Sequence, residues 1–274
     1  MLLSGRHTEE LAELVWQLWL KFSMKDLGLA RRILEMKISR NCNRQQLFLS
    51  QTNYIARVLE RWNMHSTKFA STPLPINLWL SQRDCPTSGL EGEDMKSVSY
   101  APAVSSLMYT MIAHVVGVVS RFMHNTSRSD WNAVKHVFTY LVGTKDHGIL
   151  FSPNKTSGVV GYTDSDFADC VDSQKSTTRY CFKFGNGAIS WKSKLQECTT
   201  ISATEVEYVA VSDAAKEALW FSQLAHTFRQ VDSDSAPIIY RNSQGVVALS
   251  KNPVHHNASM YIDVWYHFVW DCVI

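Results

Sequence analysis

Two acidic stretches in the second half of the chain carry the residue types of a metal site. In the first, Gly161-Tyr162-Thr163-Asp164-Ser165-Asp166, a short apolar strand runs into carboxylates. The second, Ser202-Ala203-Thr204-Glu205-Val206-Glu207-Tyr208, opens a long helix. A ligand placed at the end of a strand or helix is held more precisely than one in a loop. Because hard divalent cations prefer carboxylate oxygens, Asp164 and Glu205 suggest a carboxylate metal site.

Each of these two residues also has a simpler interpretation. Asp164 could be a surface aspartate in a turn. Glu205 follows Ser202 at the spacing of a capping box, in which the two side chains satisfy the free amides of a helix start. Both interpretations stay open at this point.

Other polar residues near the predicted site are weaker candidates. Lys192 and Lys194, in a predicted hairpin, could contact a phosphate backbone, but a basic hairpin end can equally be solvated. Three further aspartates of the first stretch and the turn after it are interpreted as solvated: Asp166, Asp169 and Asp172.

The elements that position these residues follow from hydrophobic periodicity and turn signals. Strands are expected at residues 159–162, 177–184, 188–192 and 237–240, with the second and third joined by Gly185-Asn186-Gly187, a strong hairpin signal. Helices are expected at 203–228, 244–249 and 262–273. Three antiparallel strands followed by a helix, a strand and a helix predict a mixed sheet with flanking helices.

The first half reads as a separate α+β unit. Helices are expected at residues 8–22, 52–62, 103–123 and 130–142, and strands at 30–39 and 46–50. Residues 81–98 are polar and contain Pro86, Gly89 and Gly92, so they are expected to form a mobile loop. Residues 143–148 form a hinge, which divides the chain into domains at 1–150 and 151–274.

The composition of the chain sets further limits. Its 274 residues are 45% hydrophobic and 19% charged, as in globular proteins with a sizeable core. No apolar run approaches the roughly 18 residues that span a membrane, and no signal peptide is visible. Six cysteines show no CxxC pairing. We therefore expect reduced thiols in an intracellular protein, cytoplasmic or nuclear, without a membrane partner.

The charges are unevenly spread. Residues 1–150 carry 17 Lys and Arg against 12 Asp and Glu, whereas residues 151–274 carry 10 against 13. A basic half beside an acidic half suits a nucleic-acid cradle joined to a metal site, although plain surface variation would give the same difference.

The second half resembles the ribonuclease H domain of copia-type retrotransposon Pol polyproteins. Besides the two acidic stretches, the motifs that carry the resemblance are Lys175-Ser176-Thr177, Ala188-Ile189-Ser190-Trp191-Lys192-Ser193-Lys194, Lys251-Asn252-Pro253 and Ile262-Asp263-Val264-Trp265-Tyr266-His267-Phe268. Residues 1–150 resemble the C-terminal part of the reverse transcriptase of the same polyproteins. The motifs there include Met24-Lys25-Asp26-Leu27-Gly28, Ser71-Thr72-Pro73-Leu74-Pro75 and Ser106-Leu107-Met108-Tyr109.

This resemblance implies a fold, a reaction and a ligand set. The fold is a ribonuclease H-like mixed sheet of the α/β class, preceded by an α+β remnant of a reverse transcriptase. The reaction is cleavage of RNA in RNA/DNA hybrids by two Mg²⁺ ions held by four carboxylates. Asp164 and Glu205 match the first two positions, but Asn242 stands at the third, where the family has an aspartate. The chain ends before the fourth, and the paired polymerase aspartates are not in it.

We therefore expect a retrotransposon Pol fragment that is catalytically defective. Asn242 has no charge and binds Mg²⁺ far more weakly than a carboxylate, and the neighbouring Arg241 disfavours a cation further. The alternative is a non-enzymatic remnant that binds an RNA/DNA hybrid or a single strand.

Overall fold

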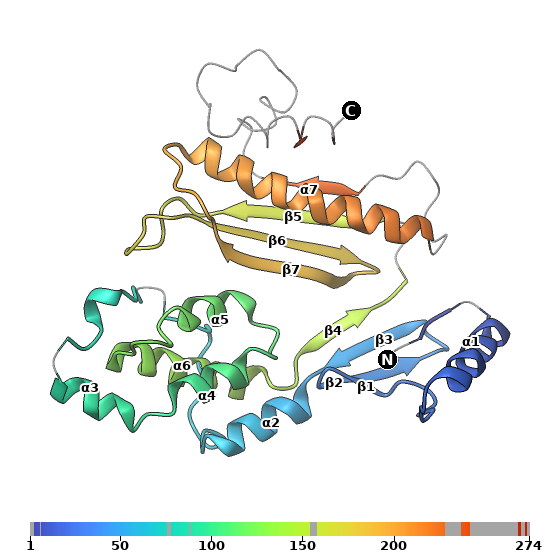
Figure 1. Cartoon of the computed structure of the whole chain (residues 1–274), viewed down its shortest axis with the longest axis horizontal. Helices are drawn as coiled ribbons and strands as arrows, with labels where there is room; N and C mark the ends of the chain where they lie inside the picture. Colours follow the sequence, from blue (N-terminus) through green and yellow to red (C-terminus); the bar gives the residue numbers. More distant parts are fainter. Residues whose placement is uncertain are drawn as a thin grey trace, which may run out of the picture.

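The computed structural model shows two four-stranded sheets, each associated with its own helices (Figure 1). It describes residues 3–5, 7–75, 78–87, 89–153, 158–227, 237–241, 268–269 and 272. The expected helix at 244–249 and most of that at 262–273 lie outside these residues. The α/β class predicted from the sequence is confirmed.

The first sheet is antiparallel and is closed by a strand from far along the chain. Its order is β1 (Arg32–Ile33), β2 (Met36–Asn41), β3 (Gln46–Ser50) and β4 (Gly148–Phe151). The single strand expected at 30–39 was wrong, because Leu34 and Glu35 have positive φ values of 44° and 63° and turn the chain between β1 and β2. The strand at the expected domain boundary, β4, pairs with β3 and so belongs to this first sheet.

The core of the first half is helical. It is formed by α2 (Thr52–Arg61), α4 (Tyr100–Leu107), α5 (Ala113–Ser120) and α6 (Arg128–Thr144). Their fully buried side chains include Val104, Leu107, Val119, Val134, Val137 and Phe138. A capping box at Ser127 and Asp130 begins α6, whose buried face has helical spacing.

The single helix expected at 103–123 was wrong, since the segment breaks into α4 and α5. Gln51 Nε2 donates to the carbonyl of Tyr109 at 2.5 Å, and Thr110 Oγ1 donates to that of Leu107 at 2.5 Å. Gln51 thus takes a carbonyl that a continuous helix would pair with an amide, while the carbonyl of Leu107 accepts from both the amide and the hydroxyl of Thr110, three residues on. The break lets both apolar halves of the segment enter one core.

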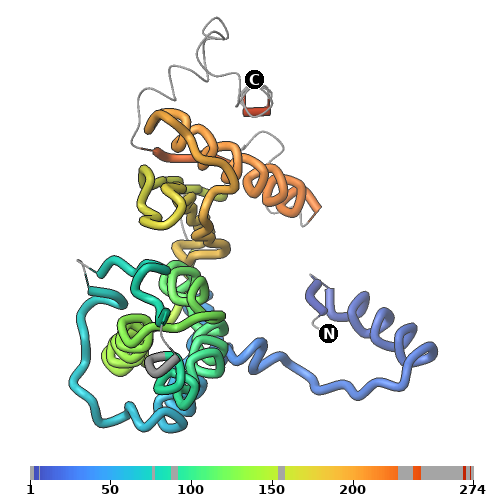
Figure 2. The backbone as a smooth tube through the Cα atoms, turned by 60° about the vertical axis from the view of Figure 1, so that its left-hand side comes forward, coloured from blue at the N-terminus to red at the C-terminus, as the bar shows by residue number. Residues whose placement is uncertain are grey.

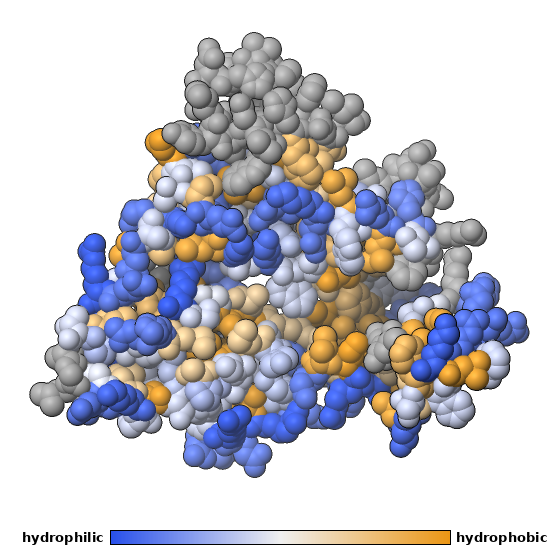
Figure 3. Space-filling model, viewed as in Figure 1, coloured by the Kyte–Doolittle hydropathy of each residue, from blue (hydrophilic) through white to orange (hydrophobic). Residues whose placement is uncertain are grey.

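Two other expectations for the first half need correction. Residues 81–98 contain a 3₁₀ helix, η1 (Gln82–Asp84), and α3 (Gly89–Lys96), not only loop. The helix α1 (Thr8–Lys21) forms as predicted, but none of its residues is buried. It stands apart from the rest of the chain (Figure 2). Trp16, Trp19 and Leu20 are each at least 60% exposed. Figure 3 shows hydrophobic and hydrophilic residues side by side on the surface in the region of α1.

The second sheet is mixed, as predicted. It has the order β7 (Gly187–Leu195), β6 (Thr177–Phe184), β5 (Val160–Ser165) and β8 (Ile238–Tyr240), antiparallel except for the parallel pair of β5 and β8. The long helix α7 (Ala203–Thr227) covers one face (Figure 1). Phe182, Ala214 and Phe221 form the centre of the core between them.

The predicted hairpin between β6 and β7 is also confirmed. Gly185 and Asn186 both have positive φ, 53° and 63°, as a tight two-residue hairpin turn requires. No helix within the described part of the chain is both long and apolar enough to cross a membrane.

Candidate metal site

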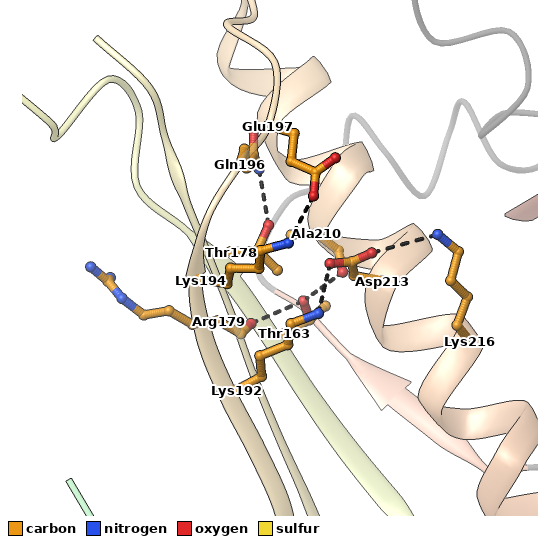
Figure 4. A network of polar contacts seen from close by, with 10 residues as sticks. All are labelled: Thr163, Thr178, Arg179, Lys192, Lys194, Gln196, Glu197, Ala210, Asp213 and Lys216. Atoms are coloured by element: carbon orange, nitrogen blue, oxygen red, sulfur yellow. Dashed lines mark hydrogen bonds and ion pairs between the residues drawn. The ribbon is translucent and has the colours of Figure 1, made fainter. Parts of the chain in front are cut away.

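Asp164 lies on the face of the second sheet that points away from α7. Its neighbour Thr163 faces α7, where its hydroxyl donates to the carbonyl of Ala210 at 3.3 Å. Successive side chains of a strand point to opposite faces, so Asp164 faces the other side. Its side chain is 59% exposed, with Arg179 Nη1 at 3.9 Å from Oδ2. Arg179 points away from α7 in the same way (Figure 4).

Asp166, on the same face, is more strongly held than Asp164. Its carboxylate accepts from the amide of Thr177 at 2.7 Å and from Arg179 Nη2 at 2.6 Å, and its side chain is only 17% exposed. Burial raises the pKa of Asp166, while the Thr177 amide and the Arg179 charge lower it. The interpretation of Asp166 as a solvated turn residue was therefore wrong. Arg179 therefore forms its shorter ion pair with Asp166 and a longer one with Asp164.

Glu205 caps the start of α7. Its Oε2 accepts from the amide of Ile201 at 3.1 Å, and its own amide donates to Ser202 Oγ at 3.3 Å. The bond to Ser202 is one half of the capping box that the Ser-x-x-Glu spacing left open, while the Glu205 carboxylate accepts from the amide of Ile201, one residue before Ser202. In this conformation the carboxylate is directed back along the chain, toward the amides before the helix.

The end of β8 carries a buried cation. Arg241 follows Tyr240, and its side chain is 8% exposed. Arg241 Nη2 donates to Glu207 Oε2 at 2.5 Å, and the side chain of Glu207 is 25% exposed. Burial lowers the pKa of Arg241, whereas the charge and hydrogen bond of Glu207 raise it. The next residue, Asn242, lies outside the described residues.

Polar atoms gather beneath the first turns of α7, at the same end of the sheet. Gln196 is 5% exposed, and its amide nitrogen donates to Thr178 Oγ1 and to the carbonyl of Val206. Within the described residues, several buried side-chain atoms of this domain have no hydrogen-bond partner: Ser165 Oγ, Gln196 Oε1, Thr200 Oγ1, and Nε and Nη1 of Arg241. Buried polar groups are normally satisfied, so this end of the domain differs from its apolar centre.

These residues do not fit a pair of Mg²⁺ ions. Asp164 faces away from α7, Glu205 caps the helix, and Glu207 is neutralised by Arg241. Within the described residues no three His, Cys, Asp or Glu side chains are grouped closely enough to hold a metal. A hard cation that prefers six oxygen ligands needs such a group.

Lys192 and Lys194, the predicted phosphate contacts, both lie in ion pairs. Lys192 Nζ is 3.2 Å from Asp213 Oδ2 on α7, and Lys194 Nζ is 2.8 Å from Glu197 Oε1 (Figure 4). Lys192 also lies over the ring of Tyr180. A phosphate group would have to compete with these carboxylates. The nucleic-acid role of both lysines stays a prediction.

The face of the sheet opposite α7 is joined to the first half through α5. His114 Nδ1 lies 3.0 Å from Ser193 Oγ of β7. Burial lowers the pKa of His114, and Arg179 lowers it further, while Asp166 raises it. The histidine therefore connects the carboxylate face of the second sheet with the helical core of the first half.

A second contact between the halves is made by Asp172. Its carboxylate accepts from Ser81 Oγ at 2.6 Å and from the amide of Gln82 at 3.0 and 3.1 Å. Asp172 is an exposed turn residue, as the sequence indicated, but its carboxylate also accepts hydrogen bonds at the start of η1. The signal in the sequence was the serine at the start of η1. Neither segment has a local pattern that predicts contact between this serine and an aspartate about ninety residues away.

Sequence comparison finds relatives in plants. The chain is 43% identical over 279 residues to the retrovirus-related Pol polyprotein from transposon TNT 1-94 of Nicotiana tabacum, covering all of this chain and 21% of that protein. It is 32% identical over 274 residues to the retrovirus-related Pol polyprotein from transposon RE2 of Arabidopsis thaliana, covering 98% of this chain and 18% of that protein. An uncharacterized mitochondrial protein of Arabidopsis thaliana is 35% identical over 222 residues, 81% of this chain and 91% of its own length.

The chain thus spans about a fifth of the length of the Pol polyproteins it matches. No family model matches the chain, and no solved structure matches it.

Proposed function

Since this chain belongs to the family of retrovirus-related Pol polyproteins from plant transposons, we propose that residues 151–274 are a ribonuclease H-type domain that no longer cleaves RNA/DNA hybrids. The order of the second sheet supports the domain type: three antiparallel strands, a crossing helix and a parallel fourth strand. The positions of Asp164 at the end of β5 and Glu205 at the start of α7 support it too.

One observation carries the proposed loss of cleavage. At the end of β8, beside the third ligand position, the chain places the buried Arg241 in an ion pair with Glu207. A hard divalent cation near a buried guanidinium meets like-charge repulsion in a medium of low effective dielectric. The replacement of an aspartate by Asn242 removes one charge that would offset it.

The direct test is a cleavage assay with a labelled RNA/DNA hybrid. Purified full chain is incubated with Mg²⁺ or Mn²⁺, next to the Asp164→Asn variant and a known ribonuclease H. We expect cleavage by the chain to equal that of Asp164→Asn. Metal-dependent cleavage that Asp164→Asn abolishes would refute the proposed loss and establish an active nuclease.

A second candidate is nucleic-acid binding without cleavage, which the net positive charge of residues 1–150 favours. Binding of this kind rests on lysine and arginine contacts with phosphates, so its affinity must fall steeply with salt. Fluorescence anisotropy with a hybrid and with a single strand, over a salt series, distinguishes it from no binding. Because Lys192 and Lys194 are already in ion pairs, Lys192→Gln is expected to change the affinity less than twofold.

A further inference from the structure

The ion pair of Arg241 and Glu207 lies between two elements that meet only in the folded domain. Arg241 follows β8, which pairs with β5 in parallel through Tyr162 and Tyr240. Glu207 lies in the second turn of α7, which begins at Ala203. The pair therefore connects the edge strand of the sheet to the start of the helix that covers it.

Both partners are too buried for the pair to be a surface feature. The side chain of Arg241 is 8% exposed and that of Glu207 is 25% exposed. Arg241 Nη2 lies 2.5 Å from Glu207 Oε2. By contrast, the Arg57–Glu35 pair of the first half has side chains 59% and 37% exposed. Buried pairs are strongly coupled, because removing one partner leaves a charge without a counterion in a poorly solvating environment.

The location of this cation matters because Glu207 lies in the second turn of α7 with a side chain that is only 25% exposed. Without a positive charge here, the Glu207 carboxylate would be partly buried without a counterion, which would weaken the contact of α7 with β8. Arginine suits the position because it stays charged even where burial lowers its pKa.

We propose that the Arg241 guanidinium is a built-in cation that holds the start of α7 on β8, so that this end of the domain is stable without a divalent ion. The inference concerns stability and goes beyond the proposed loss of cleavage, which it does not require. Among the residues that the structure describes, Nε and Nη1 of Arg241 have no hydrogen-bond partner, and Glu207 is the counterion of the guanidinium.

A double-mutant cycle on the full chain tests the proposal. The thermal midpoint is measured for wild type, Glu207→Gln, Arg241→Gln and the double variant, each in EDTA and in millimolar Mg²⁺. Glu207→Gln leaves the buried guanidinium uncompensated, so we expect its midpoint to fall by roughly 5–15 °C. The double variant, in which two neutral amides face each other, should recover at least half of that loss.

The matched control is the same cycle on Arg57 and Glu35, where each change should move the midpoint by less than about 2 °C. Wild type should have the same midpoint in EDTA and in Mg²⁺. Arg241→Gln should become more stable in Mg²⁺ than in EDTA, because Glu207 then lacks its cation.

Two results would overturn the proposal: no coupling between Arg241 and Glu207, or a rise of the wild-type midpoint in Mg²⁺ that Asp164→Asn removes. If the chain cleaves the hybrid while Arg241 and Glu207 are still coupled, the proposed loss of activity is refuted and this inference stands.

Discussion

Asp172 offers the sharpest test of how the two halves of the chain are joined. Its carboxylate accepts from Ser81 Oγ and twice from the amide of Gln82, at 2.6 to 3.1 Å. Ser81 itself is 8% exposed and begins the 3₁₀ helix η1. The Asp172→Ala variant removes every one of these acceptors and leaves the buried hydroxyl and the first amide of η1 without them.

The size of the effect can be bounded from these contacts. Hydrogen bonds to charged groups contribute about 1.5–3 kcal/mol each, and a helix cap about 0.5–2 kcal/mol. Asp172 is exposed, so water replaces part of what is lost. We therefore expect Asp172→Ala to lower the free energy of unfolding by about 1.5–3 kcal/mol, and Asp172→Asn, which keeps one acceptor, by about half as much.

The measurement is urea denaturation of wild type, both variants and Asp169→Ala. Asp169 is the matched control, since it is exposed in the same loop and accepts no hydrogen bond from the described part of the chain. Its replacement should change the free energy by less than about 0.5 kcal/mol. Proteolysis after Arg83 should become faster in Asp172→Ala only. If Asp172→Ala and Asp169→Ala unfold alike, the reasoning is wrong.

Two further predictions concern His114 and Gly161. Because burial keeps the pKa of His114 below its ordinary value of 6.5, its neutral form stabilises the fold above pH 6.5, and that stability is lost as the pH falls below 6.5. The stability difference between wild type and His114→Gln, measured by denaturation, should therefore shrink from pH 7.5 to pH 5.5; an unchanged difference would mean that His114 is not the group that titrates. A Cβ on Gly161 would lie 2.5 Å from Cε1 of Phe182, which is fully buried, so Gly161→Ala should cost about 1–3 kcal/mol. Gly92→Ala, where a Cβ meets nothing within 4 Å in the middle of α3, is the control and should stabilise the chain or leave it unchanged.

Local patterns in the sequence determined the elements of the second half well. Alternation of apolar residues predicted β6 with the correct bounds, and the Asn-Gly turn predicted the hairpin, because both depend on residues close together in the chain. The helix α2, expected at residues 52–62, was predicted from helical spacing in the same way. The family too could be named from motifs, since motifs are local strings.

The same local patterns were misleading where distant parts of the chain intervene. The apolar run at 103–123 predicted one helix, but Gln51 takes a carbonyl in its middle and the run folds back on itself. The polar run at 81–98 predicted a loop, but Asp172 caps the start of η1. In both cases a side chain from another element satisfies a backbone group that local reasoning leaves to water.

For the candidate site too, some features follow from the sequence and others only from the tertiary structure. The sequence by itself determined which residues are acidic, where they lie on strand and helix, and that Asn242 stands where the family has an aspartate. Only the tertiary structure decided what the charges do: Arg179 pairs with Asp166, Glu205 caps α7, and Arg241 is buried against Glu207. The physical reason is that the partner of a charge is set by which strands and helices pack together, and the energy of the pair by how far that packing excludes water.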